Sequence, residues 1–145
     1  MKILLEVNKK YEKPELHVCC EKPTEEIRSI MDRLEDMFVE RVTVYGDQEA
    51  RTISVSDIVR IYSANKKVYI RTKDATFEVH ERLYTLEEKL ENNGFVRISN
   101  SEIVNTLEIE KLDMGISGTI RMYMKNGDVT YVSRRYVSTI RKKLG

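Results

Sequence analysis

Apolar and polar residues alternate near the N-terminus in two short stretches, residues 2–7 and 15–20. Alternation with a period of two is typical of a half-buried strand, so we predict a β-strand in each stretch. Apolar residues then recur at spacings of three and four after a potential N-cap at Thr24, which predicts an amphipathic helix. The apolar stripe of this helix consists of Ile27, Ile30, Met31, Leu34, Met37 and Phe38. With a further strand predicted at residues 42–45, we interpret residues 1–50 as a β-β-α-β extension.

From about residue 51 the pattern changes to short apolar runs that are separated by turns. One predicted hairpin turns at residues 73–75, and another turns at Asn126-Gly127, a dipeptide favoured in two-residue hairpin loops. Small amphipathic helices are predicted at residues 83–90 and after Ser133. Residues 51–145 are therefore predicted to be mostly antiparallel strands with small helices. This places the chain in the mainly β, α+β class and does not fit a helix-turn-helix pattern.

The net charge of +1 conceals an uneven distribution of charged residues. Residues 1–50 carry 8 basic and 12 acidic side chains, whereas residues 51–145 carry 17 basic and 12 acidic ones. Residues 121–145 carry seven basic side chains and a single acidic one, Asp128. The basic end of such a chain would be attracted to a polyanion, and the acidic end would be repelled. A solvated basic helix explains the same charges, so charge raises nucleic-acid binding as a hypothesis without deciding it.

The residues that would support catalysis or metal binding are too few and too far apart. The two histidines, His17 and His80, lie on different predicted strands, and His17 with Cys19 and Cys20 does not complete a tetrahedral metal site. There is no phosphate-binding glycine loop and no nucleophile elbow. We therefore expect a non-enzymatic protein without metal or cofactor.

The cysteine content and the hydropathy pattern favour a cytoplasmic location. Adjacent cysteines provide no disulfide framework. The N-terminus meets an acidic residue too early for a secretory signal, and no window approaches the roughly 18 apolar residues of a membrane span.

Several motifs, in a consistent order, resemble one family. Residues 94–105 (GFVRISNSEIVN) resemble the signature F-x-R-x-x-x-S-x-x-(I/V)-N of LytTR (LytR/AlgR-type) DNA-binding domains. Residues 125–136 (KNGDVTYVSRRY) are similar to the n-G-x-x-x-x-(V)-S-R-x-Y ending of that family. The pair Asp57-Ile58, the first hairpin and the leucines of residues 83–90 also match in order and spacing. The resemblance covers about residues 51–144.

The resemblance implies an elongated stack of small antiparallel sheets that places loops, rather than a recognition helix, into successive major grooves. Members of the family regulate transcription, commonly as dimers on direct repeats in promoters. Their DNA contacts come from the first long loop, the turn before the signature serine and the segment at the final S-R. Carried over by position, these contacts fall on Asn65, Lys66, Lys67, Asn100, Arg134 and Arg135. Some relatives have a histidine in the first loop, where lysines here favour phosphate contact.

The chemistry of these side chains agrees with such roles. Asparagine can pair with adenine and arginine with guanine, each with about 1–3 kcal/mol of discrimination. Lysine and arginine at other positions suit phosphates, which position a protein without reading sequence. The expected phosphate contacts are Lys66, Lys67, Arg141, Lys142 and Lys143.

Structural roles compete with these assignments. Asn100 could simply close a turn, and Arg134 could face the body of the protein. Arg97 could pair with a carboxylate inside the fold. Asn105 and Ser101 are interpreted as structural residues that bond backbone at strand ends.

The first 50 residues are too few for the receiver domain that most LytTR proteins carry. The extension resembles that of stand-alone LytTR regulators, which are cytoplasmic and often controlled by a companion membrane protein. We expect its helix stripe to pack partly on its own strands and the acidic layer to mediate homodimer or partner contact.

The resulting prediction is a sequence-specific regulator of transcription that binds double-stranded DNA. A non-catalytic protein-interaction or ligand-sensing β module remains the main alternative. An RNA binder is less favoured, because no aromatic pair of the stacking type interrupts the basic residues.

Overall fold

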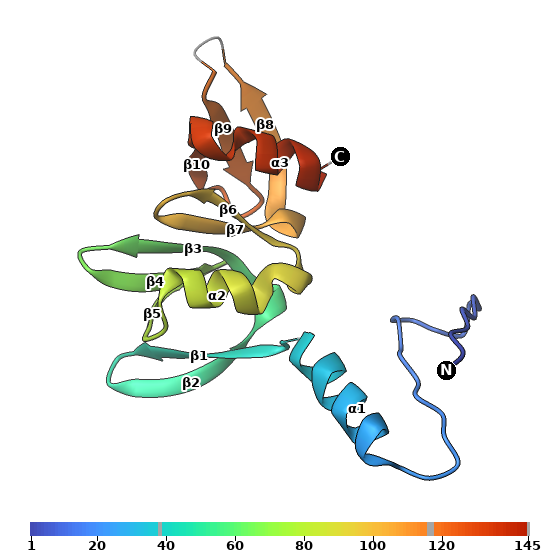
Figure 1. Ribbon diagram of the computed structural model, residues 1–145. Coiled ribbons are helices and arrows are strands. Elements are labelled where there is room, and N and C mark those ends of the chain that lie inside the picture. Colours follow the sequence, from blue (N-terminus) through green and yellow to red (C-terminus); the bar gives the residue numbers. More distant parts are fainter. Residues whose placement is uncertain (38, 116–117, 145) are drawn as a thin grey trace. The chain divides into compact units, whose positions relative to one another are not determined.

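The computed structural model describes residues 1–37, 39–115 and 118–144. The chain forms two compact units, Met1–Leu34 and Glu35–Gly145. The helices and strands of each unit are shown in Figure 1. None of the described helices is long and apolar enough to cross a membrane.

The first unit differs from the predicted extension. Residues 1–24, all of which the structure describes, contain no strand, so the strands predicted at residues 2–7 and 15–20 are wrong. Alternation alone cannot make a strand, because a strand also needs a hydrogen-bonded neighbour. Apolar side chains here stay in solvent, as shown by Ile3 at 92% and Val7 at 87% exposure.

The predicted helix is present as α1 (Glu25–Met37). The Ile27 amide donates to Thr24 Oγ1 at 3.3 Å, which confirms the predicted N-cap. Of the apolar stripe, Ile27, Ile30 and Leu34 are half-buried, Met31 and Met37 are exposed, and Phe38 lies outside the described residues. The stripe has no strands of its own extension to pack on.

The second unit contains a seven-stranded antiparallel sheet with the strand order β2-β1-β5-β4-β3-β7-β6. The strand predicted at residues 42–45 is present as β1. It pairs with β2 over six positions and therefore belongs to this sheet rather than to the extension. The hairpin predicted around residues 73–75 is confirmed as β4–β5. The strands are β1 (Arg41–Gly46), β2 (Glu49–Ser54), β3 (Ile58–Ala64), β4 (Lys67–Thr72), β5 (Thr76–Val79), β6 (Phe95–Ser99) and β7 (Glu102–Asn105).

A three-stranded antiparallel sheet follows, with β8 (Ile109–Met114), β9 (Ile120–Met124) and β10 (Val129–Val132) in the order β10-β9-β8. The predicted hairpin at Asn126-Gly127 joins β9 to β10, and Gly127 has a φ of +95° that a glycine adopts without strain. The helices of this unit are α2 (Leu83–Leu90) and α3 (Val137–Leu144), and the 3-10 turns are η1 (Val55–Asp57), η2 (Glu91–Asn93), η3 (Thr106–Glu108) and η4 (Arg134–Tyr136).

Two hydrophobic cores hold these layers together. The first lies between α2 and one face of the large sheet, and includes Leu86, Leu90, Ile61 and Ile70, all with no exposed surface. The second lies between the two sheets, where side chains of β6 and β7 meet those of β9, β10 and α3. Its buried members are Val59, Val96, Ile98, Val104, Ile120, Met122, Met124, Val132 and Ile140. The predicted mainly β architecture with small helices is thus confirmed, and the second core attaches the small sheet to the large one.

Candidate nucleic-acid interface

Three exposed turns of the second unit lie on the same side in Figure 1: the β3–β4 turn, the β6–β7 turn and η4. Two hydrogen bonds connect them. The Ser63 amide, near the end of β3, donates to the Ser101 carbonyl at 2.8 Å, and the Tyr136 hydroxyl of η4 donates to Asn100 Oδ1 at 3.1 Å. The segments that the family resemblance singled out are therefore adjacent in space. We call this edge the turn edge.

The β3–β4 turn is shorter than the long loop that the resemblance implied. Pairing of the two strands continues to Ala64 and Lys67, which leaves only Asn65 and Lys66 as loop residues. Both have left-handed backbone, with φ of +52° and +64°, as in a type I′ hairpin. Asn65 and Lys66 are exposed at the tip, whereas Lys67 lies in β4 and forms an ion pair with Glu78 at 3.6 Å.

Arg97 holds the β6–β7 turn from the inside. Its Nε donates to the Ser99 carbonyl at 2.7 Å and one terminal nitrogen donates to the Asn100 carbonyl at 2.6 Å. Its other terminal nitrogen lies 3.5 Å from a carboxylate oxygen of Glu87. The alternative that Arg97 pairs with a carboxylate is therefore confirmed, but the partner is 40% exposed on α2 and not inside the fold. The backbone that carries the exposed Asn100 side chain is thus fixed by the signature arginine.

Asn105, the last residue of the signature, is structural, as predicted. It is buried, its Nδ2 donates to the Ile58 carbonyl at 2.9 Å, and its Oδ1 accepts from the Leu107 amide at 3.1 Å. An asparagine whose amide is used in this way ties β7 to the start of β3 and is not available to DNA.

The basic residues near the C-terminus divide into two groups. Arg134 and Arg135 are exposed in η4, next to Asn100, and the Arg135 guanidinium lies 5.9 Å from the centre of the Tyr136 ring. Arg141, Lys142 and Lys143 are exposed in the last turn of α3. With a rise of about 1.5 Å per residue, they lie roughly 10 Å along the helix from η4, away from the turn edge (Figure 1). The structure brings Asn65, Lys66, Asn100, Arg134 and Arg135 together, but not this second group.

The negative charge of the first 50 residues is also located differently from the expectation. Residues 1–34 carry seven basic and seven acidic side chains, so the first unit has no net charge. The excess lies in residues 35–50, with one basic and five acidic side chains, and Asp47 occupies the β1–β2 turn. The β1–β2 hairpin itself is neutral, because Arg41 and Arg51 balance Asp47 and Glu49. The excess negative charge therefore comes from Glu35, Asp36 and Glu40, which precede the hairpin.

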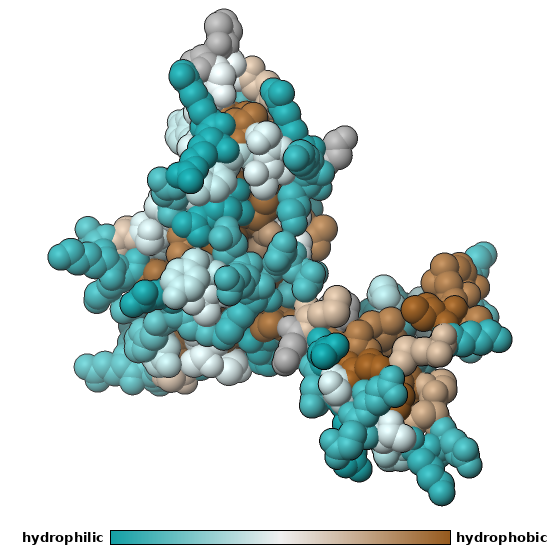
Figure 2. Space-filling model, viewed as in Figure 1, coloured by the Kyte–Doolittle hydropathy of each residue, from teal (hydrophilic) through white to brown (hydrophobic). Residues whose placement is uncertain are grey.

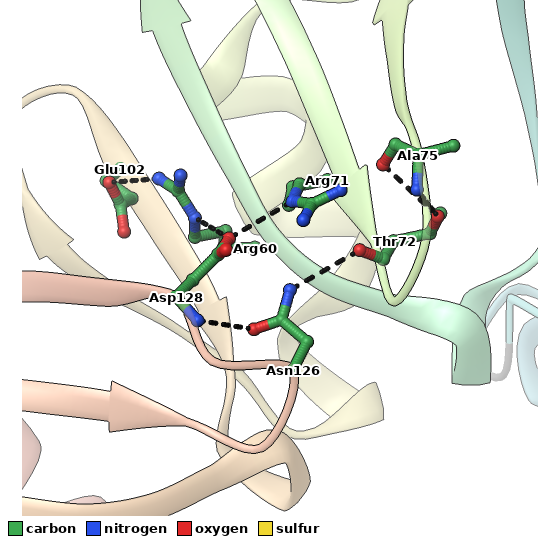
Figure 3. A network of polar contacts seen from close by, with 7 residues as sticks. All are labelled: Arg60, Arg71, Thr72, Ala75, Glu102, Asn126 and Asp128. Carbon is green, nitrogen blue, oxygen red and sulfur yellow. Dashed lines mark hydrogen bonds and ion pairs between the residues drawn. The ribbon is translucent and has the colours of Figure 1, made fainter.

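Sequence reasoning missed a network of charged side chains between the two sheets (Figure 3). One carboxylate oxygen of Asp128, in the β9–β10 turn, accepts from Arg60 Nε at 2.9 Å and from Arg71 Nε at 3.2 Å. Arg60 also donates to Glu102 at 3.2 Å. All four side chains are at most 24% exposed. The available signal was Asp128 itself, the only acidic residue in a strongly basic segment.

The two carboxylates of the network respond to it in opposite directions. Burial raises the pKa of Glu102 above its ordinary value of 4.5, and the neighbouring Thr130 and Arg60, which favour the ionised form, offset this only in part. Burial also acts to raise the pKa of Asp128, but the hydrogen bonds from Arg60 and Arg71 to its carboxylate, with the neighbouring Asn126, outweigh burial and leave the pKa below 3.8. The fold therefore stabilises the ionised form of Asp128.

We expect the Asp128→Asn variant to be less stable than the parent chain by an amount that depends on pH. A carboxyl whose pKa is lowered by folding contributes stability above its unfolded pKa and loses it as the pH falls through the folded value. The gap between parent and variant should be constant near neutral pH and narrow below 3.8. Urea unfolding at a series of pH values measures it, and a gap that stays unchanged in acid would contradict this role of Asp128.

The residues considered for metal binding have other surroundings. His17 Nε2 lies 2.7 Å from a Glu15 carboxylate oxygen, and Cys19 and Cys20 are exposed free thiols. His80 stacks on Tyr45 with ring centres 3.7 Å apart. In the described part of the chain there is no group of three or more His, Cys, Asp or Glu side chains that could hold a metal ion.

Comparison with known proteins identifies relatives of the whole chain. A protein of Staphylococcus aureus strain MSSA476, described as an uncharacterized HTH-type transcriptional regulator, is 38% identical over 145 residues, which cover 99% of this chain and 98% of that protein. A protein of strain NCTC 8325 / PS 47 with the same description is 37% identical over the same shares.

A solved structure and a family match agree with the fold. The solved LytTr DNA-binding domain from Bacillus cereus has a TM-score of 0.71 and 27% sequence identity, and the similarity covers 74% of this chain and 99% of that one. Residues 48–145 match the family described as the LytTr DNA-binding domain. The expected family resemblance is confirmed: this chain belongs to the family of LytTr DNA-binding domains.

Proposed function

We propose that the protein is a sequence-specific transcriptional regulator that reads the major grooves of double-stranded DNA through its turn edge. Asn65, Lys66, Asn100, Arg134 and Arg135 are exposed on three turns that the Ser63–Ser101 and Tyr136–Asn100 hydrogen bonds hold together. This convergence of amide and cationic side chains is the observation that carries the proposal. Family membership and the description of the relatives as transcriptional regulators support it.

The candidate DNA-binding side chains divide between two roles. Asn100 and Arg135 read bases, because amide and guanidinium groups can form paired hydrogen bonds with adenine and guanine edges. Lys66, Lys67, Arg134 and the second basic group, Arg141 to Lys143, contact phosphates and position the duplex. Since that second group lies at the far end of α3, it would meet the backbone away from the bases that Asn100 reads.

We expect Asn100→Ala to reduce discrimination between a selected and a scrambled duplex by about 5- to 150-fold, since one base contact contributes about 1–3 kcal/mol. Lys142→Ala should instead weaken binding to both duplexes equally and lower the salt dependence by about one phosphate contact. The selected duplex comes from a random pool bound by the parent chain, and titration at several salt concentrations measures both effects.

Asn92→Ala is the matched control, because Asn92 is an exposed asparagine of η2 outside the turn edge. It should leave affinity and discrimination unchanged. An equal loss on every sequence for Asn100→Ala would refute the base-reading role. Preference for single strands over the duplex in the same titration would favour RNA or single-stranded binding, and no binding to any nucleic acid would favour a protein-interaction module.

We propose further that the first 50 residues mediate homodimer contact when the protein binds direct repeats in promoter DNA. The protein would be cytoplasmic, and the same residues would contact a companion membrane protein, as the resemblance to stand-alone LytTR regulators implies. The first unit supports this, since its side chains expose a large apolar surface (Figure 2). The exposed residues are Met1, Ile3, Leu4, Leu5, Val7 and Leu16, each at least 70% exposed. Monomeric soluble proteins seldom expose so much apolar surface without a partner.

Light scattering should therefore give a dimer for the parent chain at high concentration or on a two-repeat duplex. The triple variant Ile3→Ser, Leu5→Ser and Val7→Ser should shift the mass towards the monomer, because it removes apolar surface that the contact would bury. A parent chain that stays monomeric both at high concentration and on DNA would refute the dimer.

The family is one of DNA-binding domains, and the protein is not an enzyme.

A further inference from the structure

Four charged side chains, three from strands of the large sheet and one from the β9–β10 turn, meet where the two sheets join. Arg60 of β3 and Arg71 of β4 both hold one oxygen of Asp128, and Arg60 also holds Glu102 of β7 (Figure 3). We call these four residues the latch. Asp128 is its only member from the small sheet, so the latch is a polar attachment between the sheets.

The strand β10 is attached to the large sheet at both of its ends. At its start Asp128 is bound by the two arginines, and after its end the Ser133 amide donates to the Ile98 carbonyl of β6 at 2.9 Å. Between these points Thr130 and Val132 are buried, and Val129 and Tyr131, on the opposite face of the strand, are exposed. Hydrophobic contact is not directional, whereas two polar attachments about 16 Å apart along a short strand fix the direction of that strand.

We infer that the latch sets the orientation of the small sheet on the large one, and through it the position of Arg135 relative to Asn65 and Asn100. Arg135 follows β10 in the chain, while the two asparagines belong to turns of the large sheet. Asp128 is thus a positioning residue for DNA recognition that itself touches no base or phosphate. This inference rests on the proposed function.

Electrostatic repulsion and the latch predict different effects when the charge of Asp128 is removed: the first changes the overall affinity for DNA, and the second changes the discrimination between sequences. DNA phosphates repel a carboxylate, so its removal alone should strengthen binding to every duplex. If the latch positions the small sheet, the same change should reduce discrimination between sequences. The ratio of the affinities for a selected and a scrambled duplex therefore separates the effect of charge, which leaves this ratio unchanged, from the effect of the latch, which lowers it.

The test compares Asp128→Asn with Asp113→Asn in the full chain. Asp113 is an exposed residue of β8 in the same sheet, so the control removes the same charge without touching the latch. The probes are a duplex selected by the parent chain, its scrambled version, and versions with one base pair added or removed inside the selected site.

For Asp128→Asn we expect the ratio of affinities for the selected and the scrambled duplex to fall about tenfold or more, because one misaligned base contact costs about that much. The affinity for the scrambled duplex should stay unchanged or rise. The preference for the selected site over the versions with one base pair added or removed should become weaker as well. Asp113→Asn should keep the parent ratio and the parent spacing preference. Arg71→Met removes only one bond to Asp128 and should lower the affinity ratio and weaken the spacing preference in the same way. This variant tests the proposal even if Asp128→Asn does not fold.

Hydrogen exchange of the Ser133 amide tests the latch without DNA, since its bond to Ile98 should open more often in Asp128→Asn. A folded Asp128→Asn variant with the parent ratio, spacing preference and Ser133 exchange would overturn the latch alone. A parent chain without any sequence preference would overturn the proposed function and the positioning role with it, and the exchange of Ser133 would still decide whether the latch orients the sheet.

Discussion

Replacing Arg60 with methionine is expected to lower the free energy of unfolding by about 3–5 kcal/mol, because the change removes one partner of a buried ion pair. Glu102 is only 8% exposed and forms its ion pair with Arg60. Asp128 would keep Arg71 alone. Urea unfolding followed by circular dichroism near neutral pH measures the loss.

The double variant Arg60→Met with Glu102→Gln distinguishes an unpaired charge from lost packing. If the unpaired carboxylate dominates the cost, the double variant should recover a large part of the stability. Lys67→Met is the matched surface control, since its pair with Glu78 is 55% and 33% exposed and such pairs contribute about 0–1 kcal/mol. A loss for Arg60→Met no larger than that of Lys67→Met would show that Glu102 stays hydrated after the substitution.

The second large effect is expected for Ile98→Ala in the core between the sheets. Ile98 lies in β6 with no exposed surface, and truncation of a buried isoleucine costs about 2–5 kcal/mol through lost burial and the cavity that remains. Because this core attaches the small sheet and α3 to the large sheet, the variant should also lose affinity for DNA at temperatures near its unfolding midpoint. Thermal and urea unfolding together with a DNA titration measure both consequences.

Leu107→Ala is the control for this substitution, as Leu107 is 72% exposed in η3. It should change the stability by about 0.5 kcal/mol or less. A loss below about 1 kcal/mol for Ile98→Ala would contradict the description of a tightly packed core between the sheets.

Local signals in the sequence predicted much of the second unit. The Asn126-Gly127 hairpin, the helix of Leu83, Leu86 and Leu90, and the structural role of Asn105 all follow from nearby residues, and all are present. Each depends on chemistry within a few residues: a turn that accepts positive φ, an apolar face that repeats every third or fourth residue, or an amide at a strand end.

Features that depend on a distant partner were not predictable in the same way. The strands expected at residues 2–7 and 15–20 are absent, because no neighbouring strand pairs with them. The partner of β1 is β2, across the expected boundary near residue 50. The latch joins Arg60 to residues 42 and 68 positions later in the chain, a separation at which spacing gives no information.

The candidate site was predictable as a set of residue types but not as an arrangement. Family resemblance singled out Asn65, Asn100 and Arg135, and the structure places their turns side by side. The separation of Arg141 to Lys143 from that edge depends on the direction of α3, which charge counting cannot supply.

The tips of two hairpins offer a route to a more robust protein. In each, the second loop residue, Gln48 or Lys66, keeps a side chain on left-handed backbone where glycine is the favoured residue. Relief of that conformational penalty by glycine should add up to about 1 kcal/mol per tip. Since Gln48 lies beside the acidic Asp47 and Lys66 lies on the turn edge, engineering for heat tolerance can begin at Gln48 and leave recognition intact.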